Sequence, residues 1–147
     1  MTGFGENTSG GAVRAALESL AARNAAQKIT PGQSDTLFAL LAEQRHCIDA
    51  SDLLGSSDVN ARLHQTILHI ARHSIATRVL DMLKPQNVRF QYRTILVPGR
   101  SERSFQEHRA IVEAITKRDS DQAEATMRHH LSLVAEALRK TRERREA

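Results

Sequence analysis

The sequence predicts an all-α protein of about six helices. Apolar side chains recur at intervals of three and four residues along most of the chain, as they do on one face of a helix. Only four Phe and one Tyr occur among the 147 residues, whereas Ala, Leu, Arg and Glu, which favour helices, are abundant. No alternating strand pattern and no internal repeat is visible. The length suits a single domain with a core of its own.

The first eleven residues hold four of the seven glycines and no periodic pattern, so we expect a flexible leader over residues 1–11. A first helix is expected over residues 12–27. Its predicted core face consists of apolar side chains: Val13, Ala16, Leu17 and Leu20.

A capping box opens the second helix. Thr30 can cap the helix with its hydroxyl, and Gln33 can reach back to the backbone of Thr30. This helix should run to about residue 50. A polar connection over residues 49–57, with Gly55 inside it, is expected to follow.

The next two helices are expected over residues 57–72 and 74–84. The second of them should stop before Pro85, because proline lacks the backbone N–H that a helix needs. Residues 85–100 leave two alternatives open: a continuation of the helix past a kink, or an irregular link.

The last two helices should begin at polar caps. Ser101 is the expected cap of the fifth helix, which ends near residue 117. Asp119 is the expected cap of the sixth helix, and Gln122 completes a second capping box. The sixth helix leads into a basic C-terminal tail over residues 141–147.

Composition excludes several classes of protein. The formal net charge is +4, and most of it comes from the C-terminal end, where bases complement the helix dipole. No aromatic or groove-reading motif accompanies these bases, so nucleic-acid binding by this chain is not expected. The single cysteine, Cys47, excludes an internal disulfide and fits an apolar stripe. Without a long apolar run or a signal peptide, we expect a cytoplasmic protein that does not bind a membrane.

Three histidines lie inside the apolar stripes of three different helices: His64, His108 and His130. The other four histidines fall off these stripes: His46, His69, His73 and His129. A buried imidazole needs partners for both ring nitrogens. Three inward imidazoles from three helices can share one partner, and a divalent metal ion is the obvious candidate. Borderline-soft ions, zinc or nickel, suit such a donor set best.

Two further polar groups lie near these stripes. Asn60 stands one turn before His64 on the same helical face, as a neutral additional ligand. Arg14 lies at the rim of the first helix's stripe, where its guanidinium can pair with a carboxylate of a ligand. Arg89 is a weaker candidate for the same role, because its local structure is ambiguous.

The chain also carries the motifs of a known family in order. They are Arg14 to Glu18 (Arg-Ala-Ala-Leu-Glu); Leu63, His64 and Ile67; Glu107, His108, Ile111, Ala114 and Ile115; and Asp119, Ala123, Ala125, Met127, His130 and Leu131. In this order and spacing they resemble the FCD domain, the C-terminal effector-binding domain of FadR-type and VanR-type GntR transcription regulators. The resemblance covers roughly residues 12–140.

The resemblance implies an antiparallel bundle around a central cavity for a metal and a ligand. It assigns Asn60, His64, His108 and His130 as metal ligands, and it implies a small carboxylate effector, no enzymatic activity and a homodimer as one option. The motif around His64 departs from the family, since Asn60 replaces the usual acid and Leu63 the usual Phe. DNA would be contacted only through a winged helix-turn-helix that these residues do not contain. We therefore expect either a fragment of a longer regulator or a stand-alone sensor.

Two other hypotheses for the function of these histidines stay open. A mononuclear metal-dependent hydrolase would use three His ligands and an activated water, but Glu107 precedes His108 and turns about 100° away from it, which leaves no evident general base. A structural or dimerisation bundle would use the histidines only for packing. A di-iron carboxylate bundle is disfavoured, because the chain has only one Glu-x-x-His motif, at Glu43 and His46.

Overall fold

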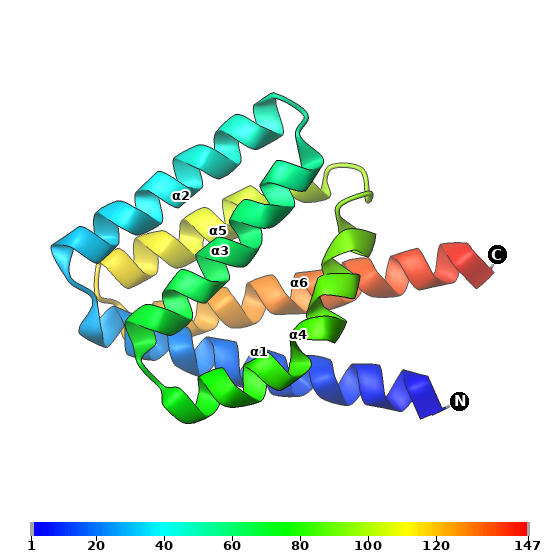
Figure 1. The fold of residues 1–147 in the computed structure, drawn as a ribbon, viewed down its shortest axis with the longest axis horizontal. Coiled ribbons are helices and arrows are strands. Elements are labelled where there is room, and N and C mark those ends of the chain that lie inside the picture. Colours follow the sequence, from blue (N-terminus) through cyan, green and yellow to red (C-terminus); the bar gives the residue numbers. More distant parts are fainter. Residues whose placement is uncertain (1, 147) are drawn as a thin grey trace.

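The computed structural model describes residues 2–146, with the side chains of residues 10–84, 93–141 and 143. Six helices account for most of these residues, and no strand occurs among them. The helices are α1 (Thr2–Lys28), α2 (Pro31–Asp49), α3 (Leu53–Ala71), α4 (Ser74–Thr94), α5 (Arg100–Thr116) and α6 (Ser120–Glu146). The all-α bundle predicted from the sequence is confirmed (Figure 1).

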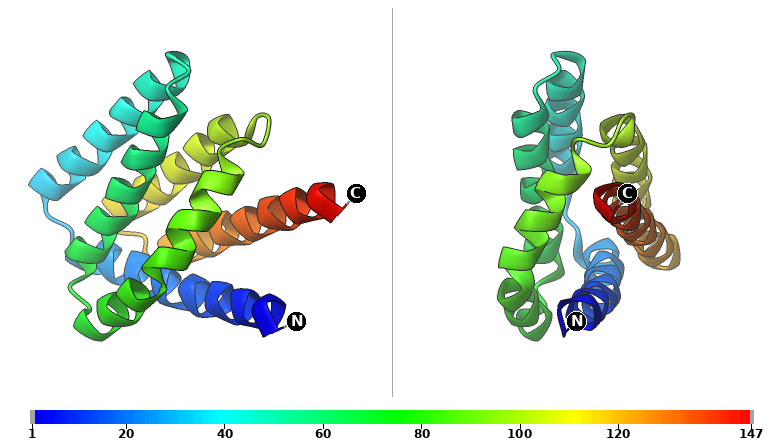
Figure 2. Two further views of the ribbon diagram at one scale, coloured as in Figure 1. Left: turned by 45° about the vertical axis from the view of Figure 1, so that its right-hand side comes forward. Right: turned by 90° about the vertical axis from the view of Figure 1, so that its right-hand side faces the viewer.

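The first and last helices lie side by side and run in opposite directions, so both chain ends lie at the same end of the bundle (Figures 1 and 2). α2 and α3 form an antiparallel hairpin, and α5 packs against α2 and α6. α1 contacts α3, α4, α5 and α6. The first helix is therefore a central element of the bundle, and its inner face contributes to the site described below.

Alanines form most of the inner face of α1. Ala21, Ala22, Ala25 and Ala26 are completely buried. Short side chains let neighbouring helices approach closely, so this small-residue face suits a helix packed between α3 and α6. The predicted core face of this helix is wrong at two positions, since Val13 is 43% exposed and Ala16 is also exposed. The prediction favoured the larger apolar residues, whereas close packing selects the smaller ones.

Two segments that were predicted to be irregular are helical, one from residue 2 onward and the other in part. α1 begins at Thr2, where a flexible leader was expected, because adding residues to an existing helix gains one backbone hydrogen bond for each residue. α3 begins at Leu53, so the predicted connection over residues 49–57 is shorter than expected. Asp52 caps α3 by accepting a 2.9 Å hydrogen bond from the backbone N–H of Gly55, which places Gly55 in the first turn.

The predicted caps hold at two helices and fail at a third. The capping box between Thr30 and Gln33 is present in both directions. Asp119 accepts a hydrogen bond of 3.1 Å from the N–H of Gln122. At α5, however, Gly99 occupies the N-cap with a φ of 75°, and Ser101 lies inside the helix. The chain enters α5 through a left-handed residue, which glycine adopts without strain, so no side-chain cap is needed for this geometry.

Of the two alternatives for residues 85–100, the structure has the longer helix. α4 continues through Pro85 to Thr94, and the ribbon of this helix bends along its length (Figure 1). A proline within a helix removes one backbone hydrogen bond and bends it. None of the described helices is both long and apolar enough to cross a membrane.

Candidate metal and ligand site

The three histidines of the apolar stripes meet at the centre of the bundle. His64 comes from α3, His108 from α5 and His130 from α6, and all three are buried. The ring centroid of His64 lies 5.3 Å from the centroid of each of the other two rings. The ring centroids of His108 and His130 lie 4.7 Å apart. One ring nitrogen from each residue can be chosen so that all three lie within 4.8 Å of one another.

Each imidazole is held by a side-chain acceptor on another helix. The Nδ1 atom of His64 lies 2.7 Å from Oε1 of Glu18, and that of His130 lies 2.6 Å from Oε1 of Glu107. Nδ1 of His108 lies 2.9 Å from Oε1 of Gln44. Carboxylate and amide oxygens accept hydrogen bonds, so each Nδ1 carries the proton and donates it. The lone pair of each ring is then on Nε2.

The free nitrogen of His108 has no partner. Its Nε2 is buried and makes no hydrogen bond within the described part of the chain. A buried nitrogen without a partner is costly, and metal-binding histidines commonly donate their other N–H to a carboxylate or carbonyl oxygen. The residues present therefore fit a divalent ion such as zinc, which takes neutral imidazole nitrogens at about 2.0–2.1 Å.

Burial keeps the imidazoles of His108 and His130 neutral. It lowers the pKa of His108 well below the usual value, and repulsion between a protonated His108 and the nearby His130, His64 and Arg100 lowers it further. The pKa of His130 falls in the same way, first through burial and then through His64, Arg100 and Arg14. At these two rings a metal ion therefore competes with no proton for Nε2.

Two arginines hold the carboxylates that orient the histidines. Nε of Arg14 donates to Glu18 across one helical turn, at 2.5 Å. Arg100 donates two parallel hydrogen bonds of 3.0 and 2.6 Å to Glu107. Burial alone would raise the pKa of Glu18, but the charges and hydrogen bonds of Arg14 and His64 outweigh it and hold this pKa well below the usual range. The site thus contains two chains of the form Arg–Glu–His.

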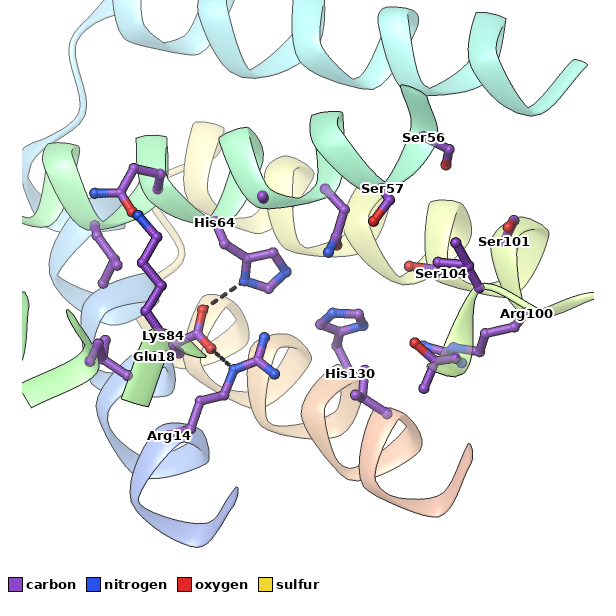
Figure 3. A pocket seen from close by; sticks show the side chains of 18 of the residues that line it. Arg14, Glu18, Ser56, Ser57, His64, Lys84, Arg100, Ser101, Ser104 and His130 are labelled. Atoms are coloured by element: carbon purple, nitrogen blue, oxygen red, sulfur yellow. Dashed lines mark hydrogen bonds and ion pairs between the residues drawn. The ribbon is translucent and has the colours of Figure 1, made fainter. Parts of the chain in front are cut away.

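A cavity of about 160 Å³ opens beside the histidines (Figure 3). His64 and His130 line it, together with Arg14 and Glu18. Asn60 also lines it, one turn before His64. The side chain of Arg89, the weaker ligand-binding candidate, lies outside the described residues. The four remaining histidines lie away from this cluster: three are exposed, and His73 is half-buried and accepts a hydrogen bond from the N–H of Ala76.

A family model described as "FCD domain" matches residues 11–133. The chain belongs to the FCD domain family. Its relatives include the HTH-type transcriptional repressor RspR of Escherichia coli and the HTH-type transcriptional regulator YdfH of Shigella flexneri. Each is 31% identical over 134 residues, which cover 91% of this chain and 59% of the relative. This FCD chain therefore spans about three-fifths of the length of these regulators.

Sequence reasoning missed four residues of this FCD site: Glu18, Gln44, Arg100 and Glu107. Glu18 follows Arg14 by four residues, so their pairing on one helix face could have been predicted. Gln44 lies three residues before Cys47 on the same apolar face of α2, and its polar amide at a buried position was the one available signal. Glu107 was set aside as a general base because of its angle to His108; the structure gives a firmer reason, since Arg100 and His130 already bind its carboxylate.

Proposed function

We propose that this FCD domain senses a small organic acid, with a bound divalent metal, as part of a GntR-type transcription regulator. The observation that carries the proposal is the convergence of three buried imidazoles beside a cavity that an arginine also lines. The relatives are HTH-type transcriptional regulators, which supports a regulatory role. DNA would be bound by another domain of the regulator, outside these residues. The regulator would act in the cytoplasm. That it forms a homodimer stays a prediction.

The metal would be held by His64, His108 and His130, with Asn60 as a neutral fourth group. Zinc or nickel suits three imidazole ligands. When bound, the ion would offer a Lewis-acidic position for an oxygen atom of the effector. Glu18, Gln44 and Glu107 keep the rings in the tautomer and orientation that such binding requires.

The carboxylate of the acid would face Arg14. The Nε of this guanidinium is bound to Glu18, whereas the group as a whole lines the cavity. In Figure 3 the guanidinium points into the space near His64 and His130. Arginine presents several N–H donors in one plane, so it can retain Glu18 and still donate to a ligand carboxylate.

The hydrolase alternative lacks support from the carboxylates of the site. A general base must be able to accept a proton from water. Glu18 and Glu107 are each bound by an arginine and a histidine, and the pKa of Glu18 is depressed. We therefore propose binding without turnover.

Elemental analysis of tag-free protein, followed by calorimetric titration of the metal-loaded form with small organic acids, tests the proposal. We expect about one divalent ion per chain, saturable binding of at least one acid and no chemical change in that acid. A metal-dependent hydrolysis of an ester or phosphate, lost in His64→Ala, would establish the enzyme instead.

A further inference from the structure

The cavity has two chemically different ends. The imidazoles of His64 and His130 and the guanidinium of Arg14 lie along one part of it (Figure 3). The other part, the serine end of the cavity, is lined by four serines, which come from the N-terminal ends of two helices. Ser56 and Ser57 belong to α3, and Ser101 and Ser104 belong to α5. In Figure 3 these four side chains lie together on the side of the cavity away from Arg14.

Ser56 is a buried polar group directed at this space. It is only 6% exposed and lines the cavity. Ser101 and Ser104 are half-buried and line the same space. The hydroxyls of these three serines are not among the buried polar atoms without a partner in the described part of the chain, so they keep access to the cavity. A ligand there can replace water as their hydrogen-bond partner.

The serine end carries no free charge among its described residues. Arg100 lines it, but the guanidinium is 7% exposed and is bound through two hydrogen bonds to Glu107. Its charge is therefore compensated inside the protein. A hydroxyl group both donates and accepts hydrogen bonds, which makes serines good partners for neutral ligand hydroxyls and poor substitutes for a second cation.

We propose that the organic acid sensed by this domain is a small polyhydroxylated acid. Its carboxylate lies toward Arg14 and the imidazoles, and its hydroxyls lie against Ser56, Ser101 and Ser104. This inference rests on the proposed function, because it assumes that an acid binds in the cavity. The volume limits its size, since an apolar cavity of about 150 Å³ in another protein accepts benzene. An acid of four carbons is the natural probe.

The experiment compares three acids on the zinc-loaded protein by calorimetric titration: 2,3,4-trihydroxybutanoate in both diastereomers, butanoate, and succinate. We expect at least one trihydroxybutanoate to bind ten times or more tightly than butanoate, because butanoate has no hydroxyls to form hydrogen bonds with the serines that line the cavity. Succinate should bind no better than butanoate.

Serine variants locate the effect. Ser56→Ala and Ser104→Ala should each weaken trihydroxybutanoate binding by about three- to tenfold, the loss of one neutral hydrogen bond, and leave butanoate binding unchanged. Ser132→Ala is the matched control, since Ser132 is exposed on α6 and binds the backbone oxygen of His129. Circular dichroism checks that each variant is folded.

The failures are distinguishable. Equal binding of butanoate and trihydroxybutanoate, or tighter binding of succinate, overturns the hydroxylated-acid proposal and leaves the sensor proposal intact. Equal weakening of all acids by Ser56→Ala also overturns it, because the variant would then act on the cavity as a whole. If none of the three acids binds, the proposed carboxylate sensor fails together with this inference.

Discussion

Oε1 of Glu107 lies 2.6 Å from Nδ1 of His130, while the next residue along α5, His108, turns its own ring into the same cluster. Two consecutive residues of α5 therefore belong to the site: Glu107 orients the ring of His130, and His108 contributes its own ring. Arg100, seven residues earlier, binds the same carboxylate. α5 thus supplies both the carboxylate that orients the ring of His130 and the arginine that balances the charge of that carboxylate.

Glu107→Gln should weaken metal binding by about ten- to a hundredfold, the usual effect of losing a residue that orients a metal-bound histidine. The amide carries no charge to balance Arg100, so the free energy of unfolding should also fall, by about 3–5 kcal/mol. Competition with a chromophoric chelator measures the affinity, and urea unfolding measures the stability. Glu113→Gln, at an exposed position of the same helix, is the control. Unchanged affinity in Glu107→Gln would exclude this orienting role.

His64→Ala, His108→Ala and His130→Ala should each lose the metal, because all three nitrogens belong to one cluster. His129→Ala should retain it, since His129 is the exposed neighbour of His130 on α6. Elemental analysis of the four purified variants gives the metal content directly. The same metal content in all four would show that the buried histidines do not form a shared site.

Removal of the metal should lower the melting temperature. The ligands come from three helices, so an ion binds the folded chain and not the unfolded one. At an ion concentration of about a thousand times Kd, the stabilisation is about 4 kcal/mol, which corresponds to on the order of 10 °C for a domain of this size. Thermal unfolding with and without a chelator measures the shift, and added zinc should reverse it. A constant melting temperature, with loss of the ion verified, would mean that the histidines only pack.

Arg14→Ala should reduce the affinity for organic acids at least tenfold, because the lost hydrogen bonds are to a charged group. Arg109→Ala is a matched control, since Arg109 is an exposed arginine of α5 paired with Glu113. Glu18 loses its arginine partner in Arg14→Ala, so metal content is measured alongside acid binding. Loss of acid binding with the metal retained supports a direct contact with the acid; equal acid binding in both variants would exclude Arg14 from the ligand site.

The local pattern of the sequence was sufficient for some of this site and not for the rest. Helical periodicity places His64, His108 and His130 on inward faces, because burial follows from spacing along a single helix. Their acceptors lie 46, 64 and 23 residues away in the chain. Those pairings depend on how helices cross, which no local pattern encodes. The inner face of α1 was misjudged for a related reason, since its alanines are selected by the closeness of neighbouring helices and not by their own hydrophobicity.

Gly55 offers a test of a boundary that the sequence misplaced. A Cβ atom built on Gly55 would lie 2.2 Å from Oδ2 of Asp52, the side chain that caps α3. Gly55→Ala should therefore displace the cap and destabilise the protein by about 1–2 kcal/mol, the typical value of an N-cap. Gly32→Ala is the matched control: Gly32 lies in the first turn of α2, a Cβ there meets nothing within 4 Å, and alanine should stabilise by up to about 1 kcal/mol. Urea unfolding of the two variants measures both effects. If Gly55→Ala were as stable as Gly32→Ala, α3 would not begin at the cap that the structure assigns to Asp52.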